Sequence, residues 1–170
     1  YLDYGVTYCF SITGIRNGIH APNDYADGKM GNLITSINNT ASGEKKSTNE
    51  PNIIFLQLES FFDINHSTEL KFSENPVPYF DSLKEKYTSG YLTVPVVGAG
   101  TANTEFEVMT GMRLAYFSPG EYPYKTILKK TTCESAPYDL KILGYNSHAI
   151  HNNVAKFYGR NVVFPNLGYD

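Results

Sequence analysis

Three separated stretches of the sequence carry side chains that suit the chemistry of phosphate esters. The first is Glu59, which directly follows the apolar run "NIIFLQL". A carboxylate at the end of a buried strand needs a cation or hydrogen-bond donors, because its desolvation is costly, and a hard divalent metal is one natural partner. The alternative is a structural carboxylate that faces solvent or caps the next turn.

The second stretch is "GAGTANTEFEVMTG", which begins at Gly98. Gly98 and Gly100 let the backbone approach a ligand closely, and the start of a following helix offers unpaired N–H groups to an anion. The hydroxyl of Thr101 could act as a nucleophile if a metal lowered its pKa. The alternative, which spacing alone favours, is a threonine N-cap completed by Thr104 or Glu105.

The third stretch is "SHAIHNNVAKFYGR". His148, His151, Tyr158 and Arg160 offer neutral and charged donors that suit phosphate oxygens. Taken singly, a histidine in the core and an arginine on a solvated face are the plainer interpretations. Taken with the other two stretches, these residues indicate a pocket for phosphoryl transfer.

The elements that must position these residues alternate along the chain. Strand patterns occur at 52–58, 90–98 and 145–151, and helical patterns at 79–87, 105–112 and 134–144, with one or two helical turns at 153–160. Such alternation predicts an α/β fold with a mostly parallel sheet flanked by helices. Active residues in such folds gather at the carboxyl ends of the strands.

Residues 1–50 read as a lead segment that precedes the regular domain at 51–170. The lead contains a short helix with Met30, Leu33, Ile34 and Ile37 on one side, and we expect this side to pack on the domain. A polar stretch, "NTASGEKKSTNEPN", then predicts a surface loop.

Composition excludes several classes of protein. The chain has 170 residues, 41% of them hydrophobic, which suits one globular domain. Its net charge is −3 and no cluster of Lys and Arg is present, so nucleic acid is not an expected partner. The sequence shows neither a signal peptide nor an apolar run of membrane-spanning length. Cys9 and Cys133 lack metal-site spacing and are expected to be buried free thiols.

Four motifs together carry a family resemblance. In order and spacing, "FLQLESF", "GAGTANTEFEVMTG", "PGEYPYKT" and "HAIHNN…FYGR…LGYD" resemble the lipoteichoic acid synthase family of the sulfatase and alkaline-phosphatase-like superfamily. The resemblance covers residues 51–170. It implies the N-terminal part of an extracellular catalytic domain, attached to the membrane of a Gram-positive bacterium by segments outside this chain. Such enzymes move glycerol phosphate from phosphatidylglycerol to a growing polymer, using Mn²⁺ or Mg²⁺.

The same resemblance assigns roles to individual residues. It makes Thr101 the nucleophile and a metal ligand, and Glu59 a second metal ligand. It places His151, Tyr158 and Arg160 where the family grips the glycerol phosphate. At Tyr158 some members carry Trp, and at residue 57, here Gln, some carry a substrate-binding His.

One element of the family pattern is missing from the sequence. The family's metal site also uses an adjacent Asp and His, and no such pair occurs in these 170 residues. We therefore expect a piece of a longer protein that holds an incomplete metal site and is inactive alone. Alternative functions are a phosphoethanolamine transferase, a sulfatase-like hydrolase of phosphate or sulfate esters, and an inactive surface-binding fragment.

Overall fold

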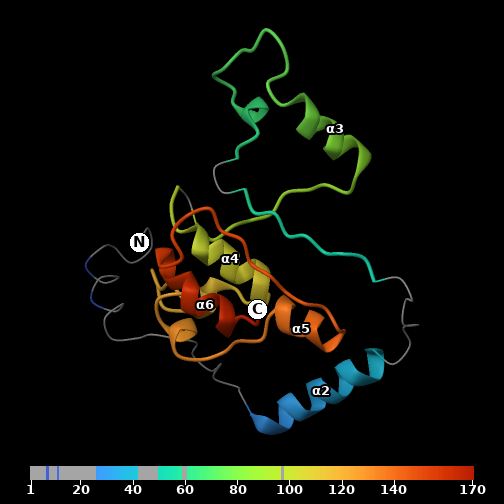
Figure 1. Ribbon diagram of the computed structural model, residues 1–170, viewed down its shortest axis with the longest axis vertical. Helices are drawn as coiled ribbons and strands as arrows, with labels where there is room; N and C mark the ends of the chain where they lie inside the picture. Colours follow the sequence, from blue (N-terminus) through green and yellow to red (C-terminus); the bar gives the residue numbers. More distant parts are fainter. Residues whose placement is uncertain (1–6, 8–10, 12–25, 42–49, 59–60, 97) are drawn as a thin grey trace.

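The computed structural model describes residues 7, 11, 26–41, 50–58, 61–96 and 98–170. Figure 1 shows a helical body, an arm that extends from it, and a separate N-terminal helix. The α-helices are α2 (Asp27–Ala41), α3 (Pro78–Lys86), α4 (Thr101–Thr110), α5 (Ala136–Ile142) and α6 (Arg160–Asn166), and the 3₁₀ helices are η1 (Ile64–His66), η2 (Leu114–Tyr116), η3 (Ile127–Lys129) and η4 (Phe157–Gly159).

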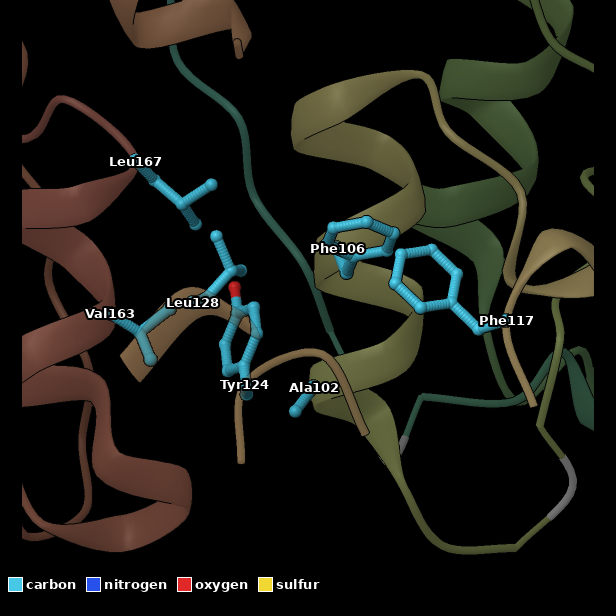
Figure 2. Close-up of a cluster of buried hydrophobic side chains, with 7 residues drawn as sticks. All are labelled: Ala102, Phe106, Phe117, Tyr124, Leu128, Val163 and Leu167. Atoms are coloured by element: carbon cyan, nitrogen blue, oxygen red, sulfur yellow. The ribbon is translucent and has the colours of Figure 1, made fainter. Parts of the chain in front are cut away.

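The body of the molecule is built around one cluster of buried side chains. Figure 2 shows side chains from α6 and η3 facing those of α4 across this cluster, with the ring of Phe106 against that of Phe117. These two rings meet edge to face, with their centroids 5.3 Å apart. The buried hydrophobic residues are Ala102, Phe106, Phe117, Tyr124, Leu128, Val163 and Leu167. The cluster therefore holds the helix that begins at Thr101 against the C-terminal helix.

Hydrogen bonds fix the end of α6 to the segments beside it. The buried hydroxyl of Ser135 donates to the carbonyl of Leu167 at 2.6 Å, and the side-chain amide of Asn166 donates to the carbonyl of Leu128 at 2.7 Å. Asp170 accepts from the backbone N–H of Ser147 at 3.0 Å. The bond from Ser135 satisfies a carbonyl at the end of the helix, and the other two tie the end of α6 to η3 and to the segment of Ser147.

The arm consists of η1, α3 and the loops around them, and a polar network stabilises it. The Nζ of Lys84 lies 2.7 Å from a carboxylate oxygen of Asp63 and 2.6 Å from one of Asp81. The side-chain amide of Asn75 donates to Asp81 at 2.7 Å. In Figure 1 this arm stands away from α4, α5 and α6, so the polar network supports the arm rather than the core.

The predicted sheet is not formed by the residues that the structure describes, which contain no strand. The run 52–58 is extended and its side chains are uncovered, with Ile54 86% and Leu56 75% exposed. A parallel strand needs neighbours that pair its N–H and C=O groups and cover both faces. Because no described segment pairs with this run, the parallel sheet stays a prediction.

Three of the predicted helices are present in the structure. The patterns at 79–87, 105–112 and 134–144 correspond to α3, α4 and α5, which confirms them within a few residues. Helix α6 was missed, because "RNVVFPN" combines β-branched residues with an internal proline.

The N-terminal helix differs from its prediction in one respect. Helix α2 forms, but its apolar side is exposed rather than packed on the domain, with Leu33 52% and Ile37 56% exposed. The predicted packing of the lead is therefore wrong in this structure, and most of the polar loop after it lies outside the described residues. Within the part of the chain that the structure describes, no helix combines the length and apolarity needed to cross a membrane.

Candidate functional site

Thr101 is the first residue of α4, and its hydroxyl has no hydrogen-bond partner. The N-cap is Gly100, which adopts the left-handed conformation at φ 97° and ψ 29°. The alternative of Thr101 as the N-cap is therefore wrong. The Oγ1 atom is nonetheless buried and unpaired. A buried hydroxyl without a partner costs about 1–3 kcal/mol, so it marks a place where a ligand or chemistry is expected.

The backbone before Thr101 passes close to another chain segment. A Cβ placed on Gly100 would lie 3.0 Å from the hydroxyl oxygen of Tyr122 and 3.2 Å from Cγ1 of Val96. Both the positive φ and this close approach require glycine at this position. The side-chain amide of Asn103 also donates to the carbonyl of Glu121 at 3.3 Å, so the "PGEYPYKT" segment lies against the start of α4.

The predicted metal ligand Glu59 lies outside the described residues. Gln57, two residues earlier in the sequence, directs its side-chain amide at the carbonyl of Thr101. The distance is 3.5 Å, which is the outer limit of a hydrogen bond. No three His, Cys, Asp or Glu side chains among the described residues are grouped as they would be around a metal. The unpaired Thr101 oxygen suits a hard divalent cation, and the metal stays a prediction.

His151 is held with one ring nitrogen as an acceptor. Its Nδ1 accepts the backbone N–H of Asn153 at 3.1 Å, and its ring stacks on that of Phe157 with centroids 6.4 Å apart. A neutral imidazole whose Nδ1 accepts carries its proton on Nε2. His151 can therefore donate from Nε2 to a phosphate oxygen or to a leaving group. His148 is exposed, so neither histidine is a buried core residue.

Tyr158 has a backbone conformation that only glycine adopts readily. Its φ is 58° and its ψ is 10°, which costs about 1–2 kcal/mol for a residue with a Cβ. Its ring stacks on that of Tyr122, with centroids 5.8 Å apart and planes 16° apart. We call this pair the Tyr122–Tyr158 stack. Strained residues of this kind often occur at functional sites, and the ring of Tyr158 here stacks on Tyr122, whose hydroxyl lies beside Gly100.

Arg160 is buried and is bound to protein groups. It is 2% exposed, and it donates to both carboxylate oxygens of Glu105, with the Nε bond at 3.1 Å. Its Nη1 donates to the carbonyl of Phe157 at 3.2 Å. The alternative of Arg160 on a solvated face is therefore wrong. The geometry shows Arg160 joining α6 to α4. The predicted contact of Arg160 with a phosphate stays a prediction.

Sequence reasoning missed three residues of this neighbourhood. Glu105 was considered only as part of a cap, and Tyr122 and Lys125 were given no role. The Nζ of Lys125 lies 4.6 Å from the ring centroid of Tyr122 and 5.3 Å from that of Tyr158. The motif "PGEYPYKT" contains two of these residues, and its tyrosines beside a lysine are the signal that could have identified them.

Burial raises the pKa of a tyrosine hydroxyl and of a cysteine thiol near the core. Burial raises the pKa of Tyr124, and the negative charge of Glu105 raises it further. Burial also raises the pKa of the Cys133 thiol, which is free and only half-buried. Cys133 is therefore a free thiol as predicted, although it is not fully buried, and Cys9 lies outside the described residues.

Comparison with known proteins supports the family resemblance at the level of the superfamily. The model of the sulfatase family matches residues 51–170. A protein of Rhizobium meliloti (strain 1021), named "Putative cyclic beta-1,2-glucan modification protein", is 31% identical over 121 residues. The match covers 71% of this chain and 18% of that relative, so the chain spans less than a fifth of the relative's length. No solved structure matches the chain.

The family match spans all three stretches that the sequence analysis combined. It covers both the helix that begins at Thr101 and the segment that carries His151, Tyr158 and Arg160. It also implies an alkaline-phosphatase-like α/β fold, which agrees with the α/β class that the alternating patterns predict. The chain belongs to the sulfatase family.

Proposed function

We propose that these residues are part of a metal-dependent phosphotransferase that moves glycerol phosphate from phosphatidylglycerol to a lipoteichoic-acid-type polymer. The observation that carries the proposal is the hydroxyl of Thr101, which is buried, unpaired and located at the first residue of a helix in a sulfatase-family chain. Negative charge that develops on this oxygen is favoured by the helix dipole and by nearby unpaired N–H groups.

The chain's own residues supply the steps of the transfer. Oγ1 of Thr101 gives its proton to solvent and attacks the phosphorus, forming an Oγ1–P bond while the bond from phosphorus to the diacylglycerol oxygen breaks and that oxygen takes up a proton from solvent. The Nε2–H of His151 is suited to donate to that leaving oxygen or to a phosphate oxygen. The hydroxyl of the acceptor then attacks the phosphorus of the glycerophospho-threonine, so that an acceptor O–P bond forms as the Oγ1–P bond breaks; the acceptor's proton is lost, and Oγ1 of Thr101 regains one.

Glu59 and Thr101 are the residues that would hold Mn²⁺ or Mg²⁺. When bound, such an ion lowers the pKa of the threonine hydroxyl and balances charge on the phosphate. His151 and Tyr158 would form the wall that receives the headgroup, and Arg160, whose guanidinium contacts the ring of Tyr158, would support that wall. The proposed setting is the outer face of the cell membrane, where phosphatidylglycerol and the growing polymer are both present.

A second candidate concerns the acceptor. The relative from Rhizobium meliloti has a name that refers to modification of cyclic beta-1,2-glucan. The same threonine chemistry would serve a glucan hydroxyl as the acceptor, because the second step needs only an alcohol near the phosphorus. A related transfer of phosphoethanolamine differs in the headgroup, and hydrolysis of phosphate or sulfate esters differs in using water as the acceptor.

The test uses the natural-length protein with vesicles that contain headgroup-labelled phosphatidylglycerol. We expect release of diacylglycerol by the parent, loss of at least about 10³-fold in rate for Thr101→Ala, and partial activity for Thr101→Ser. Thr104→Ala, on the same helix, is the matched control and should retain the parent rate. Thr101→Ala should not lower the stability and is expected to raise it, because the deleted hydroxyl is buried and has no partner.

Parallel reactions separate the candidates. Vesicles with phosphatidylethanolamine test the headgroup, and added glycerol-phosphate polymer, cyclic beta-1,2-glucan or water alone tests the acceptor. If Thr101→Ala releases diacylglycerol at the parent rate, the threonine mechanism is wrong. If the parent cleaves an aryl sulfate and leaves phosphatidylglycerol intact, the protein is a hydrolase and the proposed transferase activity is wrong.

A further inference from the structure

The strongest unassigned feature of the structure is the cation beside the Tyr122–Tyr158 stack. The two rings are nearly parallel, and the Nζ of Lys125 lies within 5.3 Å of both ring centroids. The hydroxyl of Tyr122 abuts Gly100, the residue before Thr101. The stack thus connects the position of Lys125 to the start of the helix that carries the proposed nucleophile.

Lys125 has a charge that no described carboxylate neutralises. The ion pairs of the described residues bind Lys84, Lys141 and Arg160 to acidic partners, and none of those ion pairs includes Lys125. Its side chain is exposed, and among the described residues it contacts the faces of the two rings. An exposed cation–π contact contributes only about 0.5–1 kcal/mol, which is less than a charge-assisted bond to phosphate. The ammonium can therefore turn to an anion without leaving a buried charge unpaired.

Arg160 is in the opposite situation. Three of its N–H groups bind Glu105 and the carbonyl of Phe157, and the side chain is 2% exposed. Moving its guanidinium onto a substrate would leave the largely buried carboxylate of Glu105 unpaired, which is costly. Of the two cations that contact the ring of Tyr158, Lys125 is the one at the surface.

We infer that Lys125 binds the phosphate oxygens of the phosphoglycerol substrate, with its ammonium held on the Tyr122–Tyr158 stack, in which the hydroxyl of Tyr122 abuts the residue before Thr101. The inference rests on the proposed function and adds a binding residue to that site. A lysine suits this role because it has three rotatable N–H donors. These donors can stay bonded to the phosphate oxygens while one P–O bond breaks and another forms. Arg160 then acts as a positioning residue, through Glu105 and the rings beside it.

The test measures binding separately from turnover. Natural-length protein is titrated with glycerol phosphate by calorimetry, and inorganic phosphate and uncharged glycerol serve as comparison probes. We expect Lys125→Met to weaken binding of glycerol phosphate by about tenfold or more, and Lys125→Arg to keep most of it, because one charge is removed or retained. Lys130→Met removes an exposed lysine five residues away and should leave binding unchanged. With phosphatidylglycerol as substrate, Lys125→Met should raise KM more than it lowers kcat.

The outcomes distinguish this inference from the proposed function. If the parent turns over phosphatidylglycerol and Lys125→Met has unchanged Kd and KM, the proposed role of Lys125 is wrong. The proposed transferase activity is then still supported. Lys125-dependent binding of glycerol phosphate by a protein that does not turn over phosphatidylglycerol supports the binding residue and removes the transferase. A parent that binds neither glycerol phosphate nor inorganic phosphate overturns the inference.

Discussion

Arg160 on α6 donates hydrogen bonds to both carboxylate oxygens of Glu105 on α4, across 55 positions of sequence. Glu105 lies one helical turn after Thr101, so the pair fixes the helix that carries the proposed nucleophile against the segment that carries Tyr158. Bidentate pairing gives this contact a defined orientation as well as energy. The ion pair is therefore the main polar link between the two halves of the candidate site.

The first prediction concerns the stability of this pair. Glu105→Gln or Arg160→Met alone should lower the free energy of unfolding by about 3 kcal/mol, because each leaves one buried charge unpaired. The double variant should lose clearly less than the sum of the two single losses. Urea unfolding of the parent and the three variants measures this. Additive losses would mean that the two side chains do not stabilise the fold as a pair.

The second prediction concerns the glycines before Thr101. Gly100→Ala should destabilise the fold by about 2 kcal/mol, through its positive φ and through the contacts of the new Cβ with Tyr122 and Val96. Gly98→Ala is the matched control, because φ is also positive there and no atom lies within 4 Å of the new Cβ. It should cost only about 1 kcal/mol.

Activity provides a second measurement on the same variants. Displacement of Tyr122 by the Cβ at residue 100 should also reduce turnover of phosphatidylglycerol in Gly100→Ala. Equal stability and equal activity of Gly100→Ala and Gly98→Ala would show that the approach of Tyr122 to Gly100 has no importance.

The third prediction concerns the strained backbone at Tyr158. Tyr158→Gly and Tyr158→Ala both remove the ring from the stack, and they differ only in the Cβ at φ 58°. The glycine variant should be the more stable of the two by about 1 kcal/mol, the reverse of the usual order. Thermal unfolding of both variants measures the difference, and a more stable alanine variant would argue against the left-handed conformation. Tyr158→Phe should keep both the stack and the parent stability.

The fourth prediction concerns the pH dependence of the arm. Hydrogen bonds from Lys84 lower the pKa of Asp63 and of Asp81 below the ordinary value of 3.8. Since the folded pKa values lie below the unfolded ones, the contacts stabilise the arm fully above pH 3.8, and this stabilisation disappears as the pH falls through the lower folded values.

Titration of the carboxylates by NMR tests this prediction. In Lys84→Met the pKa values of Asp63 and Asp81 should both rise toward 3.8, because their main hydrogen-bond donor is gone. Lys86→Met, an exposed lysine on the same helix, should leave them unchanged. Titration curves for Lys84→Met that coincide with those of the parent would contradict the assignment.

Local pattern was enough to identify several elements because their signals are local. Proline at the start of α3, and the apolar spacing that precedes Gly111 in α4, lie within a few residues of the elements they specify. The sheet is different, since each strand needs hydrogen bonds from a segment distant in sequence. The run 52–58 has the composition of a buried strand and no such partner among the described residues.

The sequence by itself determined the sulfatase family, predicted the helix at 105–112 with Thr101 near its start, and proposed the set of residues with the chemistry to handle a phosphate ester. Only the tertiary structure decided that Gly100 is the helix cap, that Arg160 is committed to Glu105, and that Lys125 stands over the Tyr122–Tyr158 stack. The physical reason is that capping, ion pairing and ring stacking depend on angles and distances between segments, whereas residue type and spacing define only which partners are possible.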